Sequence, residues 1–241
     1  MRSASKSVST GSRAVVLLSG GMDSATVLAI ACRQRPRIVA LTVAYGQRHA
    51  REIACARALA RHFHVGEHLI YRLPLLPLAP SALTDRRIAV PRTRGLPRVH
   101  RGGEIPPTYV PARNTIFLSL ALALAESRRA DRIYLGINAV DYSGYPDCRP
   151  EFLRAFERVA RLGTAVVERG GAPIRLVAPL LHWSKAQIVR EGERLGVPWE
   201  RTWSCYRGGQ RPCGRCDSCL WRAQGFREAG RVDPLVGPLP R

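Results

Sequence analysis

The chain has 241 residues, of which 46% are hydrophobic, and a formal net charge of +20. This length and composition predict one sizeable folded domain with a small appendage and argue against a disordered chain. No apolar run approaches the roughly 20 residues needed to cross a bilayer, so a membrane-spanning protein is excluded.

Alternating strands and helices are expected from the hydrophobic periodicity of the chain. The expected strands are residues 13–18, 37–43, 67–71, 132–136 and 174–177, and the expected helices are residues 24–34, 47–63, 115–127, 149–168 and 185–195. In the helix at 149–168 the apolar face consists of Phe152, Phe156 and Val159. This alternation predicts an α/β fold with a parallel sheet covered by helices on both faces.

Segment 73–111 interrupts this alternation. It is rich in proline and arginine and has no clear period. A structureless stretch of this length is expected to be a lid-like loop over a substrate or partly disordered.

Polar or glycine-containing sequence follows three of the expected strands, after Leu18, Val43 and Leu135. Ligands of parallel sheets bind beyond the carboxyl ends of the strands. We therefore expect a binding site where these three ends meet.

The first of these loops, Ser19–Ser24, reads SGGMDS and opens an expected helix. Its glycines let the backbone approach a ligand closely, and the helix N-terminus adds unpaired N–H groups that suit phosphate. The simpler interpretation is a glycine-rich turn in which Asp23 and Ser24 cap the helix. The loop lacks the GxxxxGK[ST] pattern of Walker A and resembles the PP-loop of N-type ATP pyrophosphatases. That resemblance implies that it holds the pyrophosphate portion of ATP while the α-phosphorus is attacked.

Arginine carries almost all of the positive charge, since Lys6 and Lys185 are the only lysines. The arginines are scattered apart from a dense run at 86–101, which indicates compositional bias more than a nucleic-acid surface. Attraction of anionic small molecules such as ATP is the interpretation we prefer, and no nucleic-acid partner is expected. Because a compact ammonium binds phosphate as a point charge, Lys185 is expected to be catalytic, with a surface lysine retained by chance as the alternative.

Four of the seven cysteines cluster with the spacing Cys205-x7-Cys213-x2-Cys216-x2-Cys219. Residues 1–12 lack the apolar segment of a secretory signal and are expected to be a disordered tail of a cytoplasmic protein, where such clusters favour metal. Four thiolates leave no open position on tetrahedral Zn²⁺, which predicts one structural zinc per chain. An iron–sulfur cluster also takes four cysteines, and a redox disulfide pair explains four poorly.

Other polar residues near the strand ends have several possible roles. Arg113 could pair with a carboxylate in a bidentate fork, while Asn114 or Thr115 could simply cap a helix. Asp141 and Asp147 could hold Mg²⁺ on ATP, bind an amino group or cap turns.

Blocks along nearly the whole ordered chain together resemble the 7-cyano-7-deazaguanine synthase family, which makes the nitrile precursor of queuosine. The blocks are SGGMDSATVL, AYGQRH, TYVPARNTIFLSLA, GINAVDYSGYPDCRPEF, SKAQIV, GVPWERTWSCY and PCGRCDSC, in that order. NAVDYSGYPDCRPEF and TWSCY with PCGRCDSC are the most specific. Two departures stand out: Met22 replaces a common glutamine, with its side chain expected to point away from the phosphates, and the run 86–101 is unusually basic.

The resemblance implies an adenine nucleotide alpha hydrolase-like, Rossmann-like fold and a conversion of a carboxylate to a nitrile. The implied substrate, 7-carboxy-7-deazaguanine, attacks ATP through its carboxylate to give an acyl-adenylate, which ammonia converts to the amide. A second activation, of the amide oxygen, followed by elimination gives the nitrile. Mg²⁺ accompanies ATP, and relatives suggest a homodimer.

Particular residues receive roles on this basis. Ser19, Asp23, Ser24 and Lys185 are expected to be catalytic. ATP is expected to contact Leu18, Ser19, Gly20, Gly21, Met22, Asp23, Ser24, Ala25, Thr26, Val27 and Leu28. Substrate contacts are expected from Tyr109, Arg113, Asn138, Asp141 and Asp147, and zinc ligands from Cys205, Cys213, Cys216 and Cys219. The expected organisation is an ATP-binding α/β domain at 13–198, a zinc-binding segment at 199–226 and a C-terminal tail at 227–241.

Two other functions compete with this one. A PP-loop enzyme that adenylates a tRNA base would also explain the positive charge, but it predicts an extra tRNA-binding domain or a catalytic cysteine pair, and neither is evident in the sequence. A zinc-containing nucleic-acid-binding module without catalysis leaves the loop Ser19–Ser24 unexplained.

Overall fold

The computed structural model describes residues 12–34, 37–93, 105–138 and 144–236. In these residues five strands form one sheet: β1 (Arg13–Leu17), β2 (Arg37–Ala44), β3 (Glu67–Arg72), β4 (Arg132–Tyr134) and β5 (Arg175–Val177). Their order is β3-β2-β1-β4-β5, and every neighbouring pair is parallel. The order reverses between β1 and β4, as in a Rossmann-like sheet, which confirms the predicted fold class.

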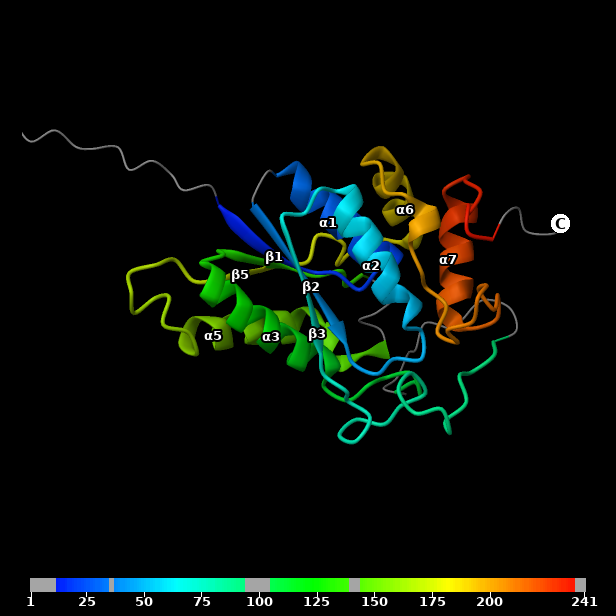
Figure 1. Cartoon of the computed structure of the whole chain (residues 1–241), viewed down its shortest axis with the longest axis horizontal. Helices are drawn as coiled ribbons and strands as arrows, with labels where there is room; N and C mark the ends of the chain where they lie inside the picture. The colour runs from blue at the N-terminus through cyan, green and yellow to red at the C-terminus, as the bar shows by residue number, and fades with distance from the viewer. Residues whose placement is uncertain (1–11, 35–36, 94–104, 139–143, 237–241) are drawn as a thin grey trace, which may run out of the picture.

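Helices cover both faces of this sheet (Figure 1). On one side lie α1 (Met22–Arg33), α2 (Arg51–His62) and α6 (Lys185–Arg194), on the other α3 (Arg113–Arg128) and α5 (Pro150–Leu162), and α7 (Asp217–Glu228) packs against α6. Side chains alternate along a strand, so Ala14 and Val16 pack in the cluster that contains α1, while Val15 packs in the cluster that contains α3. A strand buried on both faces needs this continuous apolar run. None of the described helices is long and apolar enough to span a bilayer.

Two expected helices have different limits in the structure. α2 begins at Arg51 and not at residue 47, because the side chain of Gln47 accepts a hydrogen bond from the Tyr45 amide (2.9 Å) and forms a turn there. α5 ends at Leu162 and not at residue 168, because Gly163 follows and turns replace the helix.

The expected apolar face of α5 is partly wrong. Val159 is 53% exposed, whereas Leu153, Phe156 and Ala160 are buried. Phe152, Phe156 and Val159 also follow the helical spacing of three and four, so the spacing alone could not decide which side of Phe156 faces the core. Val159 therefore contributes no core contact of the kind predicted.

The segment 73–111 forms no helix or strand in its described parts, 73–93 and 105–111. Even so, Leu75, Leu83 and Val110 are buried in the core beneath α3. The Arg48 guanidinium donates hydrogen bonds to the carbonyl oxygens of Ala82, Arg86 and Ile88. This part of the segment is thus anchored to the domain. A lid role stays a prediction, and residues 94–101 of the arginine-rich run and the expected tail at 1–11 lie outside the described residues.

Close packing between α2 and the loop after β1 depends on Gly20. Its φ of +94° is in the left-handed region, and a Cβ there would collide with the Glu52 carbonyl oxygen and lie 2.8 Å from the Ala56 nitrogen. Gly46 has a similar φ of +83°, but a Cβ there would meet nothing within 4 Å. Substitutions at these two glycines therefore distinguish the cost of backbone strain alone from the cost of strain with a steric collision.

We expect Gly20→Ala to destabilise the protein by about 3 kcal/mol or more, because left-handed strain of about 1–2 kcal/mol adds to overpacking of about 1–3 kcal/mol. Gly46→Ala should cost only about 1–2 kcal/mol, since it adds strain alone. Urea unfolding followed by circular dichroism measures both losses. Equal losses in the two variants would show that α2 does not press on the loop.

Candidate active site

A cavity of about 250 Å³ opens at the point where the strand order reverses. Leu18, Val43 and Leu135, the three strand ends expected from the sequence, all line it. The rest of the wall includes the loop Ser19–Ser24, the start of α3, residues 45–52 before and within α2, Lys185 and the segment 203–222. Residues far apart in the chain thus meet where ligands of such sheets bind.

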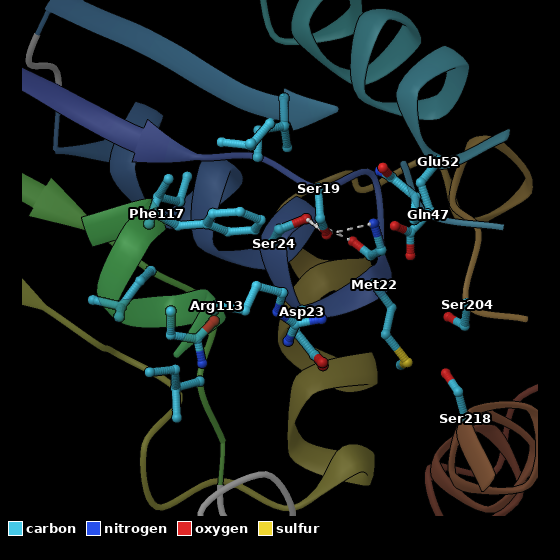
Figure 2. Close-up of a pocket in the computed structure, with 18 of the residues that line it drawn as sticks. Ser19, Met22, Asp23, Ser24, Gln47, Glu52, Arg113, Phe117, Ser204 and Ser218 are labelled. Carbon is cyan, nitrogen blue, oxygen red and sulfur yellow. Dashed lines mark hydrogen bonds between the residues drawn. The ribbon is translucent and has the colours of Figure 1, made fainter. Parts of the chain in front are cut away.

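The loop Ser19–Ser24 is held in shape by its own hydroxyl groups (Figure 2). The Gly20 amide donates to Ser24 Oγ (3.2 Å), the Gly21 amide donates to Ser19 Oγ (3.2 Å), and the two hydroxyl oxygens lie 3.1 Å apart. A Cβ on Gly136, just after β4, would lie only 3.0 Å from the Ser24 nitrogen, so this strand end presses on the N-terminus of α1. The result is a rigid helix N-terminus that faces the cavity and suits an anion.

Lys185 and Asn138 converge on Asp23 in the first turn of α1. Lys185 Nζ donates to Asp23 Oδ2 at 2.7 Å, and Asn138 Nδ2 donates to the same oxygen at 3.2 Å. A capping box formed by Ser184 and Gln187 fixes the start of α6 and so places Lys185. The other carboxylate oxygen, Asp23 Oδ1, is buried and has no hydrogen-bond partner among the described residues. A buried acceptor of this kind fits a hard cation or an N–H donor from a ligand.

Arg113 lines the cavity from the start of α3 (Figure 2). Its guanidinium donates to the Tyr45 hydroxyl at 3.4 Å and lies 6.0 Å from the centre of the Phe117 ring. Burial disfavours the charge, but Tyr45, Tyr145 and Cys148 raise the pKa of Arg113, so it stays cationic. No carboxylate of the described residues lies within ion-pair distance of it. A cation without a counter-ion in a cavity is suited to an anionic ligand.

The other expected substrate contacts surround the cavity and do not line it in the described structure. Asn138 orients Asp23, and Tyr109 stacks on Tyr145 with ring centres 6.0 Å apart. Asp147 accepts the Asn114 amide at 2.9 Å and so caps α3, whose N-cap residue is Ala112. The helix-capping roles proposed for Asn114 and Thr115 are therefore wrong. Asp141 lies outside the described residues.

Several cavity residues were not among the sequence candidates. Tyr45, Gln47 and His49 follow β2, and the only signal for them was the strand-end block AYGQRH, while Glu52 in α2 had no signal in the sequence. Further residues come from the cysteine-containing segment: Trp203, Ser204, Tyr206, Ser218, Trp221 and Arg222. Met22 extends from the loop towards Ser204 and Ser218 (Figure 2).

The four clustered cysteines bring their sulfur atoms within 4.8 Å of one another. All are free thiols, and the Cys213 amide donates to Cys205 Sγ at 3.3 Å. Hydrogen bonds from the thiols of Cys216 and Cys219 lower the pKa of Cys205, while donating to Cys205 raises the pKa of Cys216 to about 12. Four soft ligands around one point fit a single tetrahedral metal ion, and no ligand position is left open for a substrate.

The cysteine segment touches the loop Ser19–Ser24 directly. The Trp203 amide donates to the Gly20 carbonyl oxygen at 2.9 Å, and the Trp203 indole donates to the Cys205 carbonyl oxygen, also at 2.9 Å. One residue therefore joins the sulfur cluster to the loop. The cluster can stabilise the site without taking part in any chemical step.

A buried ion pair fixes α7 against this segment. Arg222 donates to both carboxylate oxygens of Asp233 at 2.6 and 2.8 Å, and both side chains are 4% exposed. The same guanidinium donates to Thr202 Oγ1 and to the Trp199 carbonyl oxygen. The chain after residue 226 thus still contributes to the core, since α7 runs to Glu228 and Asp233 lies beyond it.

A family profile and the curated relatives agree on one family. The family profile described as queuosine biosynthesis protein QueC matches residues 13–230. A 7-cyano-7-deazaguanine synthase of Synechococcus sp. (strain CC9605) is 53% identical over 220 residues, 91% of this chain and 95% of the relative. Another, of Anaeromyxobacter sp. (strain Fw109-5), is 56% identical over 228 residues, 93% of this chain and 95% of the relative. Among solved structures, an NMN synthetase from Francisella tularensis has a TM-score of 0.49 and 16% identity, with 92% of this chain and 79% of that chain covered.

Proposed function

The chain belongs to the family of queuosine biosynthesis protein QueC, and we propose that it converts 7-carboxy-7-deazaguanine and ammonia to 7-cyano-7-deazaguanine with ATP. The observation that carries this proposal is the pairing of two anion sites in one cavity. The helix N-terminus at Ser19–Ser24 suits phosphate, and Arg113, which has no carboxylate partner among the described residues, suits a substrate carboxylate.

The chemistry explains why both anions must meet. A carboxylate is a poor electrophile, so its oxygen first attacks the α-phosphorus of ATP and pyrophosphate leaves. The acyl-adenylate then has AMP as its leaving group, which ammonia displaces to give the amide. Activating the amide oxygen in the same way and eliminating AMP gives the nitrile. A site for these steps supplies positioning and charge neutralisation more than covalent chemistry.

We assign roles to the residues on the same basis. The segment from Leu18 to Leu28, which includes the loop and the first part of α1, would hold ATP. Its amides and the hydroxyls of Ser19 and Ser24 would contact the phosphates. Lys185 would exchange part of its contact with Asp23 for the phosphates. Mg²⁺ would neutralise phosphate charge. Asp23, which has one carboxylate oxygen without a hydrogen-bond partner within the described ranges, is the residue that fits it.

We further propose that the sulfur cluster holds structural Zn²⁺. A Zn–S distance of about 2.3 Å places tetrahedral sulfurs roughly 3.8 Å apart, and Cys213 and Cys219 sulfurs already lie 4.0 Å apart. An iron–sulfur cluster occupies the space between its thiolates and holds them farther apart. A homodimer and a cytoplasmic location stay proposals beside this one.

The proposed activity is tested by mass spectrometry of the product formed from 7-carboxy-7-deazaguanine, ammonium salt, ATP and Mg²⁺. We expect the nitrile, with AMP and pyrophosphate as coproducts and none of them when ATP is omitted. ATP turnover that requires tRNA and ignores the free base would instead favour the tRNA-adenylating alternative.

Replacing Lys185 by arginine should lower kcat by roughly 100-fold, because the planar guanidinium cannot place its charge where the compact ammonium meets the developing charge. The fold should remain intact. Lys185 has no room to shift, since a Cβ on the neighbouring Gly225 would lie 2.7 Å from Lys185 Cβ. The matched control is Lys6→Arg, the other lysine of the chain. Steady-state kinetics that show near-normal turnover of Lys185→Arg would contradict its role.

Elemental analysis should find one zinc per chain, and Cys213→Ser should lose it because three ligands bind the ion less tightly than four. Cys32→Ser, at a cysteine outside the cluster, is the control and should retain it. Because Trp203 joins the cluster to Gly20, the metal-free protein should also show a higher KM for ATP. A brown protein with a visible absorption shoulder would indicate an iron–sulfur cluster.

A further inference from the structure

Glu52 is the acid of the cavity that no permanent cation neutralises. Among the described residues that line the cavity, the carboxylates are Asp23 and Glu52, and Asp23 is paired with Lys185. The side chain of Glu52 is 13% exposed, and its ion-pair partner is His49, whose Nε2 lies 3.1 Å from Glu52 Oε2.

The arginines next to Glu52 in sequence are directed elsewhere. Arg48 binds the backbone carbonyls of the segment 82–88. Arg51 lies over the Trp203 ring at 4.6 Å and donates to the Gln210 carbonyl oxygen. Neither of these two arginines therefore forms an ion pair with Glu52, although arginine is abundant in the chain.

The ring of His49 is held in place, but one of its two nitrogens is left without a hydrogen-bond partner among the described residues. It is 2% exposed, packs against Tyr206 with ring centres 6.0 Å apart, and lines the cavity. With Nε2 directed at Glu52, its other ring nitrogen, Nδ1, is buried without a hydrogen-bond partner among the described residues. A buried ring nitrogen of this kind marks a place where a ligand completes the hydrogen bonding.

The pair lies between the two anion sites. The backbone of Glu52 lies against Gly20 of the loop Ser19–Ser24, and Glu52 and Ser19 both line the cavity (Figure 2). On its other side, Glu52 acts on Tyr45, whose pKa is raised to about 12 mainly by burial and in part by this carboxylate. The Tyr45 hydroxyl in turn contacts Arg113. A group bound at Glu52 would therefore lie between the loop Ser19–Ser24 and Arg113, the sites proposed above for phosphate and carboxylate.

From this placement we propose, on the basis of the function proposed above, that Glu52 and His49 form the binding site for the nitrogen donor, and that Glu52 accepts its proton. At neutral pH ammonia is present as ammonium, which is a cation without a free electron pair. The carboxylate binds this cation and takes one proton. The freed electron pair of nitrogen forms the C–N bond at the acyl carbon. The bond between the acyl carbon and the phosphate oxygen then breaks, and AMP leaves with the electron pair of that bond. The second surplus proton of nitrogen passes to the AMP phosphate.

Glu52→Gln separates this role from adenylation. It should slow amide formation from ammonium by about 100-fold or more, as for loss of a proton acceptor, and raise the KM for ammonium. Carboxylate-dependent exchange of labelled pyrophosphate into ATP, which needs no nitrogen, should stay within a few-fold of wild type. Hydroxylamine is largely uncharged at neutral pH, so the variant should still form the hydroxamate from the acyl-adenylate.

Two control variants show whether a loss of the ammonium reaction is specific to the carboxylate of Glu52. Glu151→Gln, at an exposed acid of α5, should behave as wild type, and Glu52→Asp should recover part of the ammonium reaction because it restores a carboxylate. Thermal unfolding shows whether each variant folds. Equal loss of exchange, hydroxamate and amide in folded Glu52→Gln, with no recovery in Glu52→Asp, would overturn the proposal. A wild-type protein without exchange on 7-carboxy-7-deazaguanine would instead overturn the proposed function.

Discussion

The contact of α2 with the loop Ser19–Ser24 is the constraint on which the rest of the site depends. Because Gly20 has no side chain, the backbone of α2 reaches the loop, and this brings Glu52 to the cavity. The carbonyl of the same glycine accepts the Trp203 amide, so the cysteine segment reaches the loop from another direction. A larger residue at this position would separate three elements that must meet.

Charge inside the cavity is distributed differently from charge on the molecule as a whole. The chain has an excess of twenty positive charges. The cavity, in contrast, contains a neutralised pair, Asp23 with Lys185, an acid, Glu52, and a cation, Arg113, that has no carboxylate partner in the described part of the chain. The guanidinium groups of Arg48 and Arg51 donate hydrogen bonds to backbone carbonyl oxygens. The overall charge can attract anions over a distance, while these few buried groups decide what is bound.

The sequence was sufficient to predict the parallel sheet and the meeting of its strand ends, because alternation of apolar runs follows directly from burial on both faces. It did not predict α7, whose buried side includes Cys219, Arg222 and Gly225 in place of an apolar stripe. It also could not assign Asp147 to the cap of α3, since the two partners are 33 positions apart. Such pairings depend on how distant elements pack, and no local pattern encodes them.

The ion pair of Arg222 with Asp233 has a consequence for the order in which the molecule forms. Asp233 follows every strand and every other element of the site along the chain. During synthesis at roughly 5–20 residues per second, the sheet and the loop can form before this carboxylate emerges. Until then Arg222 has no acidic partner, and the segment carrying Thr202 and Trp203 is not fixed by it. The nascent protein would thus have its fold before it has a finished site.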